Sequence, residues 1–333
     1  MLGFGNFYRG SACNGQRKKT NGPLPEKANM KIRSVPVLLL CFTVAACSTL
    51  PLPVPTSRPA QVDKSAIAAP LPYSVERFSL PGPVAGVLVK VNLGDPRVRV
   101  AVALADDRDP DGDGPCVGQL ETTSQVARKH DFDITINASF FAAPTAREIA
   151  GQKVRYFVGN CGWPEGWHFS NGKLFGQPKS KMLRSTMIVH RDGKISLADL
   201  VESLPADTKF AVSGNAMMLK DGKVTPPAKD EARHPRSAVG LSTDSRTLYI
   251  FAIDGRQEPH SRGVTLAELA DIFIQFGAHN AINLDGGGST SLVIKDPATG
   301  VFSIANQPSD LSTLKLPVRI ERPVVDVLGI RVD

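Results

Sequence analysis

The sequence predicts an α+β fold, a single domain that is dominated by sheet and carries a few packed helices. Short apolar and β-branched runs recur along the chain, helical patterns are few, and turn signals separate the runs. Asn-Gly or Asp-Gly pairs at Asn171–Gly172, Asp192–Gly193 and Asp221–Gly222 each lie between apolar segments, as in tight hairpins. Hydrophobic residues make up 42% of the 333-residue chain, which is enough for a sizeable core.

The expected strands begin close to the start of the predicted domain. Val84–Val91 is a nearly continuous apolar run, and Arg97–Leu104 places Val or Leu at alternate positions, so that these residues share one face. Later segments of the same character are Phe132–Phe141, Thr186–His190, Ala238–Leu241, Thr247–Ile253, Ala281–Leu284 and Leu292–Lys295. We expect these segments to form the sheet.

Two segments favour helices, Thr122–His130 and Thr265–Phe276. In the second, Thr265 and Glu268 have the spacing of a capping box, and Gly277 lies where a helix-ending glycine belongs. Its apolar residues have the spacing of a stripe that faces a core: Leu266, Leu269, Ala270 and Phe273. This helix is expected to pack on the sheet.

The first 72 residues have the composition of an export leader and a tether. We interpret 1–29 as a dispensable extension before a second methionine, and 30–46 as a signal peptide with a basic start and a short apolar stretch. Two alanines lead into Cys47, as in the lipobox of bacterial lipoproteins, so Cys47 is expected to carry lipid. The Pro-rich segment 47–72 reads as an extended tether, and the folded domain is expected over 73–333. The predicted location is therefore the envelope of a bacterium, periplasm-facing or on the cell surface.

The net charge of +7 comes almost entirely from the leader. Residues 1–46 hold seven Lys or Arg and one acidic residue, which leaves 32 basic and 31 acidic residues from Cys47 onward. A mature charge of +1 gives no electrostatic case for a nucleic-acid partner.

Two cysteines remain after the leader and Cys47, namely Cys116 and Cys161. In an oxidising compartment we expect them to pair, because neither belongs to a CxxC motif or a His cluster. A loop of this length contributes about 4 kcal/mol on the chain-entropy estimate.

A glycine-rich turn is the most informative local feature. Asp285 ends a short apolar run and precedes Gly286, Gly287, Gly288 and Ser289. Successive glycine N–H groups can form a concavity that binds an anion such as phosphate. A β run follows, where a P-loop or a dinucleotide-binding turn would continue into a helix. Taken alone, the turn favours a structural β-turn capped by the aspartate over an anion site.

The turn belongs to a series of motifs that resembles the phosphodiester glycosidase family. The resemblance covers roughly Pro83 to Val332 and includes five motifs in the expected order. They are Ile136–Phe141, Pro235–Gly240, Ile253–Arg256, Asn283–Val293, and a closing series made of Asn306–Asp310, Glu321–Val324 and Leu328–Gly329. The resemblance implies an exported hydrolase that cleaves a sugar-1-phosphodiester in an envelope or extracellular glycan.

Together with the chemistry of the side chains, the resemblance assigns a role to each matching residue. Asp285 and Asp254 both follow apolar strands and precede glycine, so we expect them to be the catalytic pair. Arg236 and Arg256 are expected to bind phosphate, because guanidinium groups make paired hydrogen bonds to its oxygens. The remaining substrate-binding candidates are His234, Asn137, Asn283, Gly286, Gly287, Gly288 and Ser289. No cofactor and no metal are expected.

Several alternatives stay open from the sequence. The chain fits a glycan-binding or exopolysaccharide-assembly lipoprotein without turnover, or a metal-dependent phosphodiesterase, although no HxH or HxxxH motif lies near Asp285. Asp109, Asp111 and Asp113 have the spacing of a calcium loop but lack its closing glutamate, so the sequence favours an acidic surface loop over a calcium site. The aromatic stretch around Trp163 and His168 fits either a sugar site or core packing.

Overall fold

The computed structural model describes residues 70–106, 110–111, 116–176, 184–225, 232–311 and 317–333. The predictions for the leader, for Cys47 and for most of the tether lie outside these residues, as do Asp109 and Asp113. None of the helices in the described ranges is long and apolar enough to cross a membrane.

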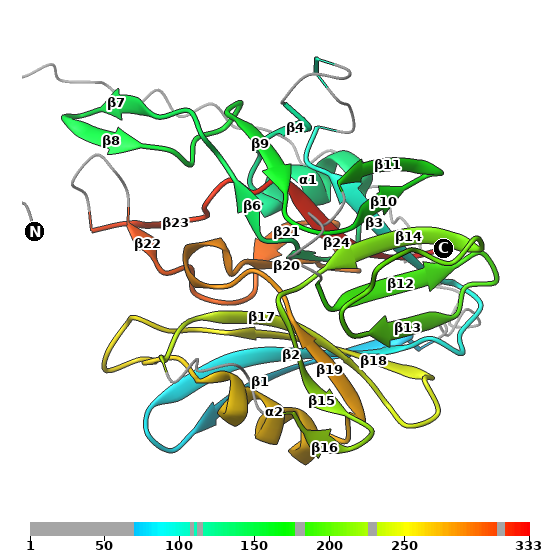
Figure 1. The fold of residues 1–333 in the computed structure, drawn as a ribbon. Helices are drawn as coiled ribbons and strands as arrows, with labels where there is room; N and C mark the ends of the chain where they lie inside the picture. The colour runs from blue at the N-terminus through cyan, green and yellow to red at the C-terminus, as the bar shows by residue number, and fades with distance from the viewer. Residues whose placement is uncertain (1–69, 107–109, 112–115, 177–183, 226–231, 312–316) are drawn as a thin grey trace, which may run out of the picture. The chain divides into compact units, whose positions relative to one another are not determined.

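The described chain is dominated by antiparallel sheet, as predicted, but the strands are divided among six sheets (Figure 1). The largest sheet has seven strands in the order β1 (Tyr73–Leu80), β2 (Val84–Asn92), β18 (Thr247–Ile253), β17 (Arg236–Leu241), β19 (Asn280–Asn283), β15 (Ala216–Lys220) and β16 (Lys223–Val224). Strands far apart in the sequence are therefore neighbours, and β17 lies between β18 and β19.

Two five-stranded sheets accompany the large one. The first has the order β21 (Phe302–Ile304), β20 (Leu292–Lys295), β5 (Ile134–Asn137), β24 (Asp326–Val332) and β3 (Val98–Leu104). The second has the order β11 (Lys173–Gly176), β10 (His168–Ser170), β14 (Thr208–Ser213), β12 (Thr186–His190) and β13 (Ile195–Ala198).

The smaller sheets lie in the connections. They are β4 (Gly118–Gln119), β9 (Cys161–Pro164) and β6 (Phe141–Ala142); the hairpin of β7 (Arg147–Ile149) and β8 (Gln152–Val154); and the pair of β22 (Asp310–Leu311) and β23 (Arg319–Ile320). Cys116 and Cys161 form a disulfide with Cα atoms 5.4 Å apart, which confirms the predicted pairing.

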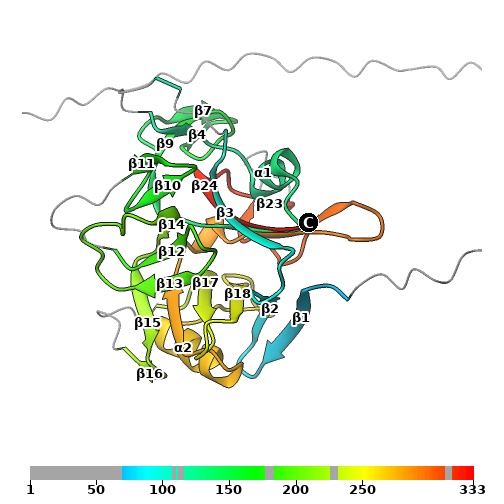
Figure 2. The same ribbon diagram turned by 90° about the vertical axis from the view of Figure 1, so that its right-hand side faces the viewer.

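Both predicted helices are confirmed, as α1 (Thr123–His130) and α2 (Leu266–Gln275). The capping box of α2 is present: Thr265 Oγ1 accepts a hydrogen bond from the Glu268 N–H at 3.2 Å, and the Glu268 carboxylate accepts one from the Thr265 N–H at 2.9 Å. Gly277 follows with a φ of 94°, a conformation that favours glycine. Helix α2 lies along one face of the large sheet (Figure 2). Its predicted apolar stripe belongs to the same buried cluster as side chains of that sheet.

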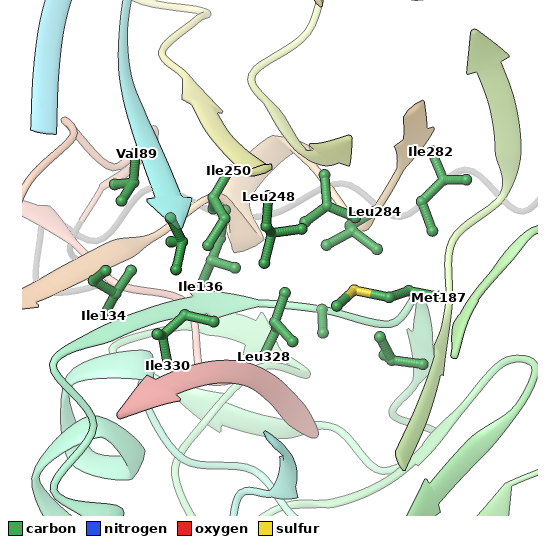
Figure 3. Packing of buried hydrophobic residues seen from close by; sticks show 14 of the residues in the cluster. Val89, Ile134, Ile136, Met187, Leu248, Ile250, Ile282, Leu284, Leu328 and Ile330 are labelled. Carbon is green, nitrogen blue, oxygen red and sulfur yellow. The ribbon is translucent and has the colours of Figure 1, made fainter. Parts of the chain in front are cut away.

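The opposite face of the large sheet forms the main core. Figure 3 shows side chains of this sheet, such as Val89 and Ile250, meeting Ile134, Ile136 and Leu328 of the first five-stranded sheet. Met187 joins the same cluster from the second five-stranded sheet. All of these side chains are at most 3% exposed, so the sheets hold one another in place and fix the strand ends that carry polar residues.

Candidate active site

A cleft of about 320 Å³ forms where three strands of the large sheet end. Seven of the predicted site residues line it: Asp285, Gly286, Gly287, Gly288, Arg236, Arg256 and His234. Arg236 begins β17, and Asp285 follows β19, the strand beside it. Because neighbouring antiparallel strands run in opposite directions, the start of β17 and the end of β19 meet at the same edge. A larger hollow of about 540 Å³ beside β3 contains none of the predicted residues.

Asp285 lies in this cleft with its backbone fixed by β5. Its N–H donates to the Ala138 carbonyl at 2.9 Å, and its carbonyl accepts a hydrogen bond from Asn137 Nδ2 at 2.6 Å. The backbone at Asp285 therefore cannot shift without breaking contacts to the end of β5. The carboxyl group is enclosed by protein atoms while the residue keeps partial access to solvent.

The pKa of Asp285 is raised to about 7, chiefly because burial removes the charged form from water. The negative charge of Asp326 raises the pKa further. The Ser289 hydroxyl, the Arg322 guanidinium and the Gly286 N–H act in the opposite direction. Asp285 is thus close to half protonated near neutral pH, a condition suited to general acid–base chemistry.

The three glycines make room for neighbouring groups. A side chain at Gly286 would meet the Pro235 carbonyl, and one at Gly287 would lie 3.2 Å from Nη1 of Arg256. A side chain at Gly288 would collide with the paired Arg322 and Asp310. The Gly287 N–H donates to the Pro235 carbonyl at 2.9 Å and the Gly286 N–H to Asp285, so at least these two N–H groups already have partners. The glycines therefore let guanidinium groups lie against the backbone.

Three arginines reach the cleft from different segments. Arg236 is 5% exposed, and its guanidinium donates to the carbonyls of Val264 and Ala232 at 3.1 and 3.0 Å. Arg322 forms a two-pronged ion pair with Asp310, at 2.9 and 3.1 Å. Arg256 has a φ of 59° and its Nη2 lies 3.1 Å from His234 Nδ1. Asp285 is the one carboxylate among the described residues that line the cleft, which suits the cleft to an anion.

The contact with Arg256 determines which ring nitrogen of His234 carries the proton. A guanidinium group only donates hydrogen bonds, so Nδ1 of His234 must accept and carries no proton. The proton of the neutral ring is then on Nε2.

Asp254 is placed differently from Asp285, although the sequence suggests that they form a pair. Asp254 is 4% exposed and is absent from the cleft lining. Its Oδ1 accepts from the Gln307 N–H at 2.8 Å and from Asn306 Nδ2 at 3.2 Å, while Oδ2 lies 2.8 Å from His260 Nε2. Both carboxylate oxygens are thus already engaged, and the structure does not bring the two carboxylates together in this cleft.

The predicted asparagines and Ser289 support the site from behind and are fully buried. Asn137 joins β5 to β17 through a 2.7 Å hydrogen bond from Ser237 Oγ, and it also holds the Asp285 carbonyl. Asn283 donates from Nδ2 to Asn215 Oδ1 at 2.8 Å, and Asn215 lines the cleft. Ser289 belongs to the short 3₁₀ turn Gly287–Ser289 and interacts with Asp285.

Sequence reasoning did not assign roles to Arg322, Asn215 and Phe140, which complete the cleft. Arg322 stands inside one of the closing motifs, so its place in that motif was a usable signal. Asn215 and Phe140 belong to connections whose course is set only by the fold. No group of three or more His, Cys, Asp or Glu side chains that would hold a metal ion occurs among the described residues.

Several known proteins are similar to this chain. The phosphodiester glycosidase family matches residues 130–331. The SPbeta prophage-derived uncharacterized protein YomE of Bacillus subtilis (strain 168) is 33% identical over 150 residues, 44% of this chain and 20% of that protein. The human N-acetylglucosamine-1-phosphodiester alpha-N-acetylglucosaminidase is 26% identical over 224 residues, 61% of this chain and 38% of that protein. The matched parts thus span less than two fifths of these relatives.

Two solved structures share the fold. The catalytic domain of the zebrafish N-acetylglucosamine-1-phosphodiester alpha-N-acetylglucosaminidase, auto-inhibited by its pro-peptide, is 20% identical with a TM-score of 0.59, covering 81% of this chain and 86% of that one. A hypothetical protein from Synechocystis is 15% identical with a TM-score of 0.54, covering 78% and 62%. The family match extends over the cleft, its three arginines and Asp285, and the chain belongs to the phosphodiester glycosidase family.

Proposed function

We propose that the protein hydrolyses a sugar-1-phosphodiester by cleaving the bond between the anomeric carbon and the phosphate oxygen. The observation that carries this proposal is a cleft whose described lining includes three arginines and the Asp285 carboxyl group, with a pKa of about 7. Guanidinium groups favour a phosphodiester, and a carboxyl group of this pKa is suited to proton transfer at neutral pH. The curated human relative carries the name of such an activity, which supports the same substrate class.

In this mechanism Arg236, Arg256 and Arg322 bind the phosphate oxygens, and His234 holds the Arg256 guanidinium through Nδ1. The departing phosphate monoester is a weak base, so it leaves with the bonding electrons and needs little protonation. The ionised Asp285 takes a proton from water while the water oxygen bonds to the anomeric carbon. The arginines stabilise the charge that develops on the leaving phosphate.

We assign Asp254 to positioning. It holds Asn306, whose side chain also donates to the Thr290 carbonyl at 3.2 Å and accepts from the Leu292 N–H at 2.8 Å. Thr290 directly follows the glycine turn. Asp254 therefore supports, through Asn306, the segment that follows Asp285 and its glycines.

A second hollow of about 340 Å³ shares Arg322 with the cleft. Its lining includes Tyr156, which lies under the Arg322 guanidinium at 4.3 Å, and the apolar side chains of Leu311 and Ile320. A diester has two organic groups, and spaces on both sides of one arginine provide room for both. This arrangement favours a diester over a monoester.

The cellular context of the proposal is that of an exported lipoprotein, anchored at Cys47 in the bacterial envelope. The basic start and the apolar stretch before Cys47 support it. Mass spectrometry of the membrane-extracted protein checks it: we expect a diacylated N-terminal cysteine that disappears in Cys47→Ser.

The test of the function is turnover of a panel of sugar-1-phosphodiesters, including N-acetylglucosamine-1-phosphodiesters, by the purified protein. We expect release of free sugar and a phosphate monoester, with strong loss in Asp285→Asn. Asp244→Asn, a change at an exposed turn, serves as the matched control. Binding of the diesters by calorimetry without product over long incubation would instead establish a glycan-binding protein.

A further inference from the structure

A second aspartate lies behind the proposed base, in contact with a buried histidine. Asp326 begins β24, and His168 begins β10 in a different sheet. Oδ2 of Asp326 lies 2.7 Å from Nδ1 of His168, and the two side chains are 1% and 0% exposed. Burying two ionisable groups is costly unless hydrogen bonds compensate. Because burying this pair is costly, we expect it to have a role beyond the stability of the fold.

Hydrogen bonds connect this pair to Asp285 by way of the backbone of Ala138 and Ser139. The N–H of Ser139 donates to Asp326 Oδ1 at 2.7 Å, and the N–H of Ala138 donates to the Asp326 carbonyl at 3.3 Å. The carbonyl of Ala138 in turn accepts the N–H of Asp285. Ala138–Ser139 therefore holds Asp326 on one side and Asp285 on the other.

The hydrogen bonds also indicate where the charge resides. Nε2 of His168 is buried without a hydrogen-bond partner in the described part of the chain. A proton on that atom would leave a buried donor of a cationic ring unpaired, which is unfavourable. The ring is therefore neutral and donates from Nδ1, and Asp326 remains a carboxylate that accepts hydrogen bonds from His168 and Ser139.

We propose that Asp326 and His168 form a positioning pair that fixes the Ala138–Ser139 link and holds a negative charge behind Asp285. This inference rests on the proposed role of Asp285 as the base. A fixed negative charge nearby disfavours ionisation of Asp285, so the base retains its proton affinity despite the arginines in front of it. The other groups that act on Asp285 are Arg322, Ser289 and the Gly286 N–H, while Arg236, Arg256 and His234 line the cleft.

The test measures the titration of Asp285 itself, so that it does not depend on turnover. Carboxyl carbons of aspartate are labelled with ¹³C, and the Asp285 resonance is identified by its absence in Asp285→Asn. In Asp326→Asn we expect the Asp285 midpoint to fall measurably below that of the wild type. In Asp254→Asn, which changes a different buried aspartate whose His260 partner is exposed, we expect the Asp285 midpoint to stay in place.

Two variants of His168 separate charge from packing. His168→Asn keeps a donor near the position of Nδ1, and we expect a midpoint close to that of the wild type. His168→Phe keeps a ring but removes the donor, so Asp326 binds a proton more readily and the Asp285 midpoint falls. This second variant also tests the proposal if Asp326→Asn does not fold.

An Asp285 midpoint that is unchanged in Asp326→Asn or His168→Phe, in protein with the wild-type circular dichroism spectrum, overturns the proposal. The midpoints also separate this inference from the proposed function. Absence of turnover on every diester, with the midpoints moving as expected, would reject the function and leave the electrostatic coupling established. Turnover with unmoved midpoints would reject the pair alone.

Discussion

Asp285 and Asp254 look alike in the sequence and differ in the structure. Each follows an apolar strand and precedes a glycine, yet the first lines a cleft with three arginines and the second is enclosed by hydrogen-bond donors. Asp285 has a pKa raised to about 7, whereas both oxygens of Asp254 already have partners. Environment rather than local sequence therefore places one aspartate in the cleft and the other in a hydrogen-bond network, and our proposed roles of base and positioning residue rest on this difference.

The largest expected difference between the two aspartates is in turnover. Asp285→Asn removes the proposed base, and we expect kcat to fall about 10²–10⁴-fold. Asp254→Asn is expected to lower kcat less and to raise KM, because it acts only by loosening the supporting segment. Steady-state kinetics on one sugar-1-phosphodiester measures both. Equal losses of kcat in the two variants would show that the predicted catalytic pair is correct.

A substitution at Gly288 tests the contribution of the arginines that line the cleft with Asp285. A methyl group there collides with the Arg322–Asp310 pair, so Gly288→Ala is expected to displace one guanidinium from the phosphate. Hydrogen bonds to charged groups contribute about 1.5–3 kcal/mol, which corresponds to a loss of about 10–100-fold in kcat/KM. Gly118→Ala is the matched control, since a methyl group added there would lie 3.6 Å from its nearest neighbours, an ordinary contact distance.

Asp254→Asn and Asp285→Asn are expected to change the stability of the protein in opposite directions. Asp254→Asn weakens charge-assisted hydrogen bonds and should destabilise the protein by about 1–3 kcal/mol. The pKa of Asp285 is higher in the folded protein than in the unfolded chain. The stability that the bound proton contributes is therefore present at low pH and is lost as pH rises through about 7. Asp285→Asn should therefore raise Tm relative to the wild type at pH 8 and less so at pH 5. Thermal unfolding of both proteins at pH 5 and pH 8 measures this difference. A Tm of Asp285→Asn below that of the wild type at pH 8 would contradict the raised pKa of Asp285.

The pH profile gives the smallest expected effect. If the ionised form of Asp285 is active, kcat/KM should rise with pH and level off above about 7, changing up to about tenfold per unit on the acid side. Asp326→Asn should move the rising part of the kcat/KM profile to lower pH, and Asp254→Asn should leave it in place. A profile that falls as pH rises through 7 would assign Asp285 to an acid role.

Local patterns predicted the elements well and the site only in part. The capping box at Thr265, the stripe of α2 and the hairpin turns depend on neighbouring residues, which the sequence displays. The separation of Asp254 from Asp285 depends on Asn306 and Gln307, some fifty residues from Asp254, whose position is set by the fold. The pairing of His168 with Asp326 spans two sheets, and no periodicity indicates it. The sheet-dominated character was predictable, whereas the division into six sheets was not.

The central claim is that the bond cleaved lies between the anomeric carbon and oxygen. Hydrolysis of a sugar-1-phosphodiester in ¹⁸O-labelled water tests it directly, with the phosphate monoester product analysed by ³¹P NMR and mass spectrometry. Attack at carbon leaves the phosphate without label, which is the predicted result. One ¹⁸O atom in the phosphate would show attack at phosphorus and would contradict the proposed role of Asp285.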